Sequence, residues 1–202
     1  KYYKVLYLND LVFIKSNPNN SNETYMSSYQ KGLLKIKNQD PTILYNETNS
    51  PIEIPGGNEA LGIRLYGSDF DKQDNFWFVQ SRIDKGLIKL TPEGQFQTID
   101  ISNIINAEDE LALGKLVVSR EGYVFFGAVS SGLVGYNPTT NEFNKIGEEL
   151  GNGNLPSTDI KALAFDNQNR LWIGTRKGLR VLYNARNFFE SGADIDSQPI
   201  II

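Results

Sequence analysis

An aromatic, β-type segment followed by a Gly-Leu pair occurs four times in this chain. The aromatic residues are Tyr25, Trp77, Phe125 and Trp172, and the pairs begin at Gly32, Gly86, Gly132 and Gly178. Successive pairs are 54, 46 and 46 residues apart. This spacing is too long for one hairpin and fits four short antiparallel strands joined by three turns. The chain is therefore expected to be all-β and to repeat one four-stranded antiparallel sheet.

Sheets of this kind stand side by side as the blades of a β-propeller. We expect blades at approximately 9–45, 62–99, 115–146 and 159–202, with residues 1–8 as the outer strand of a preceding blade. Four blades form only an arc, which leaves sheet faces and edges uncovered. The chain is therefore expected to be part of a larger propeller, an internal fragment whose partners include other blades or domains of the same longer chain.

The repeated aromatic residue is expected to lie between neighbouring blades. Sheets that stack face to face need large side chains between them. A ring that stacks on a ligand is the alternative, but packing alone accounts for all four positions.

The chain has no cysteine and no histidine. This absence excludes disulfides, thiolate nucleophiles, imidazole metal ligands and triads with a histidine base. Carboxylate pairs, tyrosine and lysine remain for catalysis, and the acidic clusters Glu108-Asp109-Glu110 and Glu148-Glu149 fit solvated charge runs better than acid–base pairs. We therefore expect no catalytic residues, no cofactor, no metal and no enzymatic activity.

The net charge of −4 and the pI of about 5.0 argue against nucleic acid as a partner, because that function needs a dominant basic surface. No stretch approaches the roughly 18 consecutive apolar residues of a membrane helix. We therefore expect no nucleic-acid binding and no membrane-spanning segment.

The segment Asp69–Asn75 presents alternate side-chain oxygens, as a calcium loop does. It lacks the glycine and the terminal glutamate of an EF-hand. Because it lies between the first two strands of its blade, a polar hairpin loop is the favoured interpretation, with calcium as the alternative.

The last unit, at 160–179, has a hydrophobic strand from Ile160, then Asp166, a turn, Leu171–Thr175 and Gly178-Leu179. It resembles the two-component regulator propeller repeat, which has a hydrophobic strand, Asp, a turn, Leu-Trp-Ile-Gly-Thr and Gly-Leu in this order. The preceding Asn154–Ser157 step is also typical of the family. The other units match loosely, since Phe125 replaces Trp and Tyr25 begins the most divergent segment.

Proteins with such repeats fall into two groups. In one, periplasmic sensor propellers of Bacteroidota hybrid two-component systems detect polysaccharide fragments. The other contains PorZ-type accessory proteins of the type IX secretion system, which are implicated in handing anionic lipopolysaccharide to the sortase. The divergent blades and irregular spacing resemble the PorZ type more.

The resemblance implies a non-catalytic binding or scaffold module at the cell envelope, either periplasmic or on the outer-membrane surface. Its expected partners are envelope or secretion-system proteins and an anionic glycan, lipopolysaccharide or sorting substrates. A ligand-sensing propeller is the alternative.

A candidate binding face follows from the alternating strand direction. The loops between second and third strands emerge on one side, together with the loops that join successive blades. They carry Lys31, Arg82, Lys85, Ser130, Ser131, Arg176 and Lys177. Such a rim would receive carboxylate or phosphate groups. Solubilising surface charge is the alternative interpretation.

Overall fold

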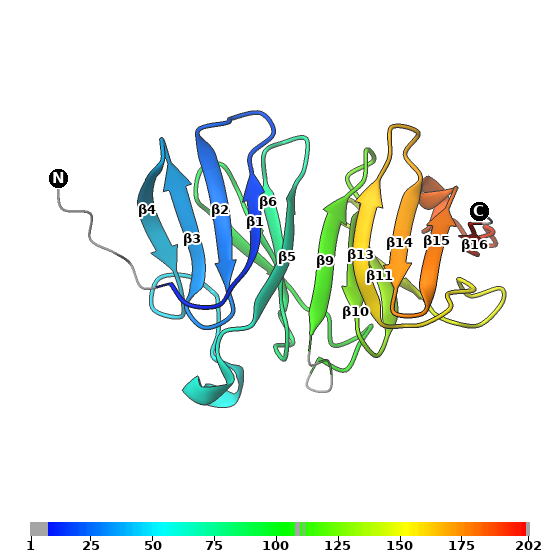
Figure 1. Cartoon of the computed structure of the whole chain (residues 1–202), viewed down its shortest axis with the longest axis horizontal. Coiled ribbons are helices and arrows are strands. Elements are labelled where there is room, and N and C mark those ends of the chain that lie inside the picture. The colour runs from blue at the N-terminus through cyan, green and yellow to red at the C-terminus, as the bar shows by residue number, and fades with distance from the viewer. Residues whose placement is uncertain (1–7, 108–109, 111, 201–202) are drawn as a thin grey trace.

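The computed structural model describes residues 8–107, 110 and 112–200, and its strands form four antiparallel sheets in a curved row (Figure 1). The predicted outer strand at 1–8 lies, apart from Leu8, outside the described residues. Strands follow one another in chain order within every sheet. The predicted all-β architecture of four four-stranded sheets is confirmed.

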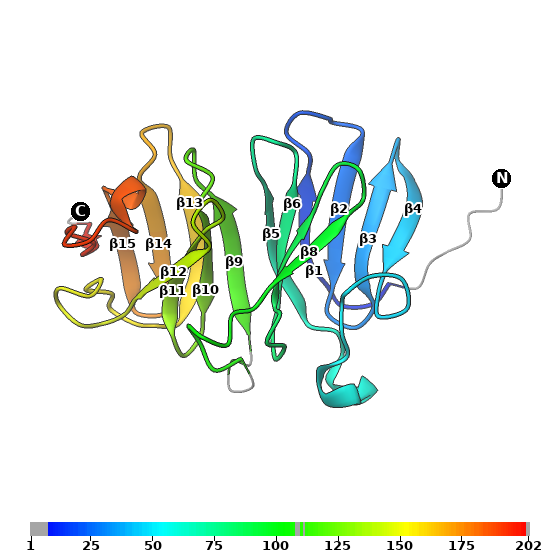
Figure 2. The same cartoon turned by 180° about the vertical axis from the view of Figure 1, so that it is seen from behind.

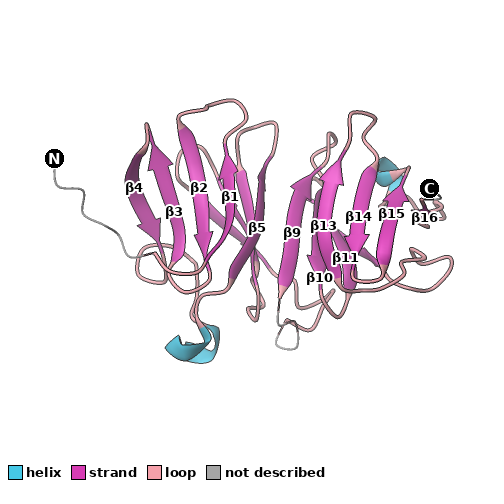
Figure 3. Ribbon diagram, viewed as in Figure 1, coloured by secondary structure: helices cyan, strands magenta, loops and turns pink. Residues whose placement is uncertain are grey.

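The described residues form sixteen strands, four in each sheet. Figure 3 draws the strands in magenta. The first two sheets contain β1 (Leu11–Ser16), β2 (Glu23–Ser28), β3 (Gly32–Lys37), β4 (Asp40–Tyr45), β5 (Leu65–Phe70), β6 (Phe76–Gln80), β7 (Leu87–Leu90) and β8 (Phe96–Ile99). The last two contain β9 (Leu113–Val118), β10 (Val124–Ala128), β11 (Gly132–Asn137), β12 (Glu142–Ile146), β13 (Ile160–Phe165), β14 (Leu171–Thr175), β15 (Gly178–Leu182) and β16 (Gln198–Pro199).

The first strands β1, β5, β9 and β13 lie next to one another in the middle of the row, and later strands fan outward (Figures 1 and 2). Three short 3₁₀ helices complete the described secondary structure: η1 (Pro55–Gly57), η2 (Glu59–Leu61) and η3 (Ala185–Asn187). None of these helices is long and apolar enough to cross a membrane.

The strand register places the four repeated aromatic residues in equivalent positions. In each sheet, the glycine of the Gly-Leu pair faces one residue of the second strand. The repeated aromatic residue lies three positions before that facing residue. The facing residues are Ser28 with Gly32, Gln80 with Gly86, Ala128 with Gly132, and Thr175 with Gly178. The sequence repeat is therefore also a structural repeat.

Glycine is required in this pair by the backbone. Gly132 has φ +86°, and a Cβ atom there would overlap the carbonyl oxygen of Ile146 in the neighbouring strand β12. Only glycine adopts this positive φ without strain and has no Cβ atom that would overlap the neighbouring carbonyl oxygen.

Three apolar clusters occupy the three contacts between neighbouring sheets. Tyr25 stacks on Phe76 of the second sheet at 4.2 Å between ring centres. Trp77 and Phe125 lie in the next two contacts, and each is at most 2% exposed. These three rings pack between sheets as expected. Trp172 is the exception: Leu171 and Ile173 on either side of it face the third sheet, so its own ring lies on the opposite, partly exposed face.

The first strands begin within three residues of the expected blade starts. The third blade was expected from residue 115 and its first strand begins at Leu113, and the second blade was expected from Gly62 and its first strand begins at Leu65. The segment before it contains η2 and then Gly62 and Arg64, both with positive φ. Local turn formation therefore delays the strand by three residues.

Candidate binding face

The loops between second and third strands all emerge at the lower end of the molecule in Figure 1. Lys31, Lys85, Arg176 and Lys177 are exposed there, and Arg82 is partly exposed with φ +64°. Among the described residues, no carboxylate lies within ion-pair distance of any of these five side chains. The structure thus places the predicted cations on one end of an arc of sheets, spread over three loops.

The part of this face between the first two sheets is mixed in charge. Its cations line shallow hollows of about 250 to 450 Å³ together with acidic side chains. Lys31 shares one with Glu47 and Glu59, Lys85 shares another with Glu47 and Glu53, and Arg82 and Lys85 share a third with Glu53 and Asp84. Four carboxylates thus accompany three cations, which weakens the attraction for a purely anionic ligand.

In the fourth sheet, the loop between the second and third strands carries two cations without a carboxylate partner among the described residues. The backbone N–H of Arg176 donates to the carbonyl oxygen of Asp159 at 2.9 Å, and that of Lys177 donates to Thr175 Oγ1 at 3.2 Å. These bonds fix the main chain and leave the guanidinium and ammonium groups to solvent. Of the predicted residues, this pair is best placed to receive an anion.

The two serines of the predicted face already have a carboxylate partner. Ser130 donates its backbone N–H to the Glu110 carboxylate at 3.1 Å, and Ser131 donates its hydroxyl at 2.6 Å. Glu110 is only 1% exposed, so the expectation of a solvated charge is wrong for this member of its cluster. Burial arises because the loop after β10 folds over the carboxylate and supplies donors. Glu108 and Asp109 lie outside the described residues, whereas Glu148 and Glu149 are exposed as expected.

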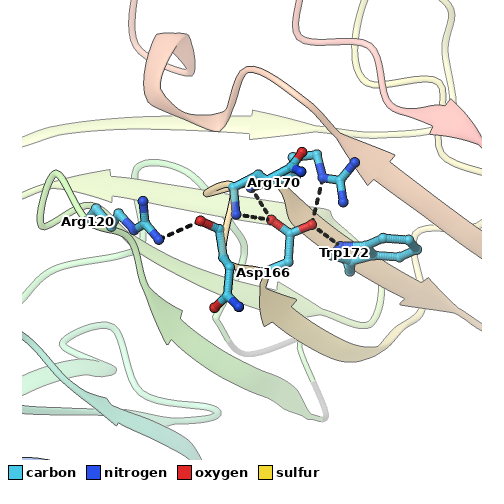
Figure 4. Close-up of polar contacts among 6 residues, drawn as sticks. Arg120, Asp166, Arg170 and Trp172 are labelled. Atoms are coloured by element: carbon cyan, nitrogen blue, oxygen red, sulfur yellow. Dashed lines mark hydrogen bonds and ion pairs between the residues drawn. The ribbon is translucent and has the colours of Figure 1, made fainter.

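At the opposite end of the sheets, aspartate organises the turn between first and second strands (Figure 4). Asp166 accepts bonds from the backbone N–H groups of Gln168 and Arg170, from Arg170 Nε at 2.6 Å and from Trp172 Nε1 at 2.8 Å. Burial alone would raise the pKa of Asp166, but the donors, led by Trp172, hold it well below its usual value.

The second sheet repeats this arrangement. Asp71 accepts from the N–H groups of Gln73 and Asn75, from Asn75 Nδ2 and from Trp77 Nε1 at 2.8 Å. In the third sheet Ser119 replaces the aspartate and Phe125 replaces the tryptophan, so carboxylate and indole N–H are lost together. The six-residue spacing of Asp and Trp, which the sequence shows at both places, is the signal from which this hydrogen-bonded pair could be predicted.

The candidate calcium loop is the β5–β6 hairpin loop, as favoured. Its three carboxylates serve three different partners: Asp69 pairs with Lys15 Nζ at 2.7 Å, Asp71 organises the turn, and Asp74 accepts from Asn19 Nδ2 at 2.8 Å. Within the described part of the chain, no cluster of three or more acidic residues has the arrangement of a metal site.

Comparison with known proteins supports the propeller assignment. Residues 154–177 match the family model described as "Two component regulator propeller". No curated protein matches the chain. Among solved structures, PorZ, a surface component of the type-IX secretion system of Porphyromonas gingivalis, is similar with a TM-score of 0.77 and 16% identity over 93% of this chain.

Two further structures share the architecture. The extracellular domain of a putative hybrid two component system from B. thetaiotaomicron has a TM-score of 0.64 and 17% identity over 88% of this chain. Virginiamycin B lyase from Staphylococcus aureus has a TM-score of 0.66 and 8% identity over 95% of this chain. The chain spans 27%, 22% and 56% of these three proteins, respectively. At such identities the likeness establishes the fold: the four sheets are built as consecutive blades of a β-propeller.

Proposed function

We propose that this chain is a non-catalytic binding and scaffold module of a cell-envelope protein, related in role to PorZ. Its ligand is an anionic glycan or lipopolysaccharide, received at the end of the blades where second and third strands meet. Envelope or secretion-system proteins and further blades of a longer chain are its partners.

The single observation that carries the proposal is the similarity to PorZ, which extends over nearly the whole chain and exceeds in TM-score that to the two component system extracellular domain given above. The chemistry of the candidate face supports it. The Arg176–Lys177 loop offers two adjacent cations without a carboxylate partner among the described residues, and arginine binds carboxylate and phosphate through two parallel donors.

Replacing Arg176 and Lys177 with serine tests the anion-binding role. Binding to immobilised alginate, a carboxylated polysaccharide, is compared with binding to neutral dextran at several salt concentrations. The double variant should lose most of its alginate binding and keep its melting temperature, because both side chains are exposed.

The matched control replaces Lys37 and Lys72, which are exposed at the opposite end of the sheets, with serine. Both double variants change the net charge equally, so only position distinguishes them. If both double variants lost alginate binding equally, overall charge would govern binding. If both kept it equally, there would be no reason to assign anion binding to the Arg176–Lys177 loop.

A ligand-sensing propeller is the second candidate, favoured by the family model matched at 154–177 and by the similarity to sensor extracellular domains. The open reading frame distinguishes the two. A transmembrane helix followed by a histidine kinase identifies a sensor, whereas further blades followed by a small β-sandwich sorting domain identify a secretion accessory.

A further inference from the structure

The segment that joins the first two sheets is longer than the other two joining segments and forms structure of its own. It comprises 19 residues, 46–64, whereas the segments at 100–112 and 147–159 comprise 13 residues each. It contains η1 and η2, which project at the lower end of the molecule in Figure 1, where the second-to-third-strand loops emerge. The two shorter segments join their sheets without such an insertion, so the insertion is not needed to connect sheets of this kind.

The main chain of this segment is held in place by hydrogen bonds. Gln80 of the second sheet is fully buried, and its Nε2 donates to the carbonyl oxygen of Ile63 at 2.7 Å and to that of Glu53. Its Oε1 accepts the backbone N–H of Glu53 at 3.2 Å. Beyond η2, Arg64 Nε donates to the carbonyl oxygen of Leu61 at 2.9 Å. The acidic side chains of the segment therefore project from an ordered main chain, which reduces the entropy lost when a ligand binds.

The three hollows between the first two sheets, in the order given above, adjoin one another. Glu47 and Ile54 line both the first and the second hollow, and Glu53 and Lys85 line both the second and the third. The hollows therefore form one elongated groove, here called the linker groove, whose charged residues are the three cations and four carboxylates already described. All of its walls come from the first two sheets and the segment that joins them, so the groove is complete without a further sheet.

Charges of both signs line the linker groove without pairing. Among the described residues, none of its three cations has a carboxylate within ion-pair distance. Lys31 lines only the first hollow and Arg82 only the third, whereas Glu47 and Glu53 lie where neighbouring hollows meet. The groove thus has a cation toward each end and two carboxylates between them. These carboxylates repel a ligand that is anionic throughout.

We propose that the linker groove binds an extended segment of a partner protein that has basic side chains in its middle and an acidic side chain toward each end. The basic side chains contact Glu47 and Glu53, and the acidic ones contact Lys31 and Arg82. Alternate side chains of an extended polypeptide point to the same side, so one such segment can present both signs of charge along a groove. The inference does not rest on the anion-binding role of the Arg176–Lys177 loop, which lies in a different sheet.

Two peptides of identical composition test the order of charges. One is Glu-Ser-Lys-Ser-Lys-Ser-Glu and the other is Lys-Ser-Glu-Ser-Glu-Ser-Lys, each with blocked ends and the same fluorescent label. Neither has a net charge, so the overall charge of the chain does not distinguish them. Fluorescence anisotropy should show about tenfold tighter binding of the first peptide, because the second places like charges opposite one another. The preference should decrease as salt is added.

Replacing the three acids of the inserted segment tests which residues read this order. The triple variant Glu47→Gln, Glu53→Gln and Glu59→Gln should bind the two peptides about equally. A matched control changes three acids that are exposed outside the groove and alters the net charge by the same amount. It consists of Glu93→Gln, Glu142→Gln and Glu190→Gln, and it should keep the preference. All six side chains are exposed, so both variants should keep the melting temperature of the unmodified chain.

Failure of this proposal is distinguishable from failure of the anion-binding role. Equal affinity of the unmodified chain for both peptides, or an unchanged preference in the variant of the inserted segment, would overturn the proposal for the groove. Equal loss of preference in the control variant would also overturn it, because overall charge would then govern binding. Alginate that displaces the first peptide would assign the groove to the glycan instead. Replacing Arg176 and Lys177 with serine should leave the peptide preference intact, whatever its effect on alginate binding.

Discussion

Trp77→Ala should destabilise the chain far more than Trp172→Ala, although the two residues occupy equivalent positions in their sheets. Trp77 is 2% exposed and packs against Tyr136 of the third sheet, with 6.1 Å between ring centres. Its truncation leaves an enclosed cavity and costs about 3–5 kcal/mol. Trp172 is partly exposed, so water fills much of the space after truncation, and about 1–3 kcal/mol is expected.

The corresponding phenylalanine variants isolate the hydrogen bonds. Trp77→Phe keeps most of the ring contacts and removes the N–H that donates to Asp71, which is 9% exposed. A bond to a buried charged group contributes about 1.5–3 kcal/mol. Trp172→Phe should cost less, because the Asp166 carboxylate is 23% exposed and also binds Arg170 Nε.

Urea unfolding provides the measurement. The chain contains two tryptophans, so each variant keeps one as a fluorescent reporter, and circular dichroism gives an independent transition. For a chain of this size, 3–5 kcal/mol corresponds to a decrease of about 6–20 °C in melting temperature. Equal losses for Trp77→Ala and Trp172→Ala would refute the argument, because they would show that the ring of Trp172 is as fully buried as that of Trp77.

Three further measurements test turns and contacts between sheets. The carboxyl pKa of Asp166 lies below its ordinary value of 3.8, so its charge stabilises the fold above that pH and this contribution is lost as the pH falls through the lower folded-state pKa. A melting series from about pH 6 to pH 2 should therefore be flatter for Asp166→Asn. Gly132→Ala should lower the free energy of unfolding clearly more than Gly122→Ala, for which roughly 1 kcal/mol is expected. Both glycines have positive φ, but only at Gly132 would the added Cβ atom meet neighbouring backbone. Equal losses of stability in urea unfolding would contradict this. Asp69→Asn should cost about 1–3 kcal/mol, and Lys15→Met less, because the aspartate also accepts a backbone N–H from the third sheet; the reverse order would show that the ion pair dominates.

The sheets could be predicted because their signals are local. Turn residues such as Asp166 and Asn169, and glycines such as Gly132, mark where strands must end, and the repeat spacing of the aromatic residues indicates the number of sheets. These features depend on backbone conformation within a few residues. Even the error at Gly62 involved a local turn and only three residues.

The properties of the candidate sites depend on contacts between distant segments, which the sequence pattern does not reveal. Glu110 looked like part of a solvated acidic run, yet a loop twenty residues later supplies its donors. Three of the four acids around Lys31, Arg82 and Lys85, namely Glu47, Glu53 and Glu59, come from the segment that joins the first two sheets, so the loop sequences alone do not reveal the mixed charge of that face.

Each sheet has two different faces, because alternate residues of a strand point in opposite directions. In β10, Phe125 faces the fourth sheet, whereas Val124 and Phe126 face the second. Contact between neighbouring sheets is therefore heterologous. The face of one sheet that carries the repeated aromatic residue packs against the opposite kind of face of the next sheet. Units joined in this way have a head and a tail, and two identical copies cannot pair through these faces about a two-fold axis. Every added unit turns the row in the same rotational sense, so the contact that stabilises neighbours also determines the direction in which a ring of such units closes.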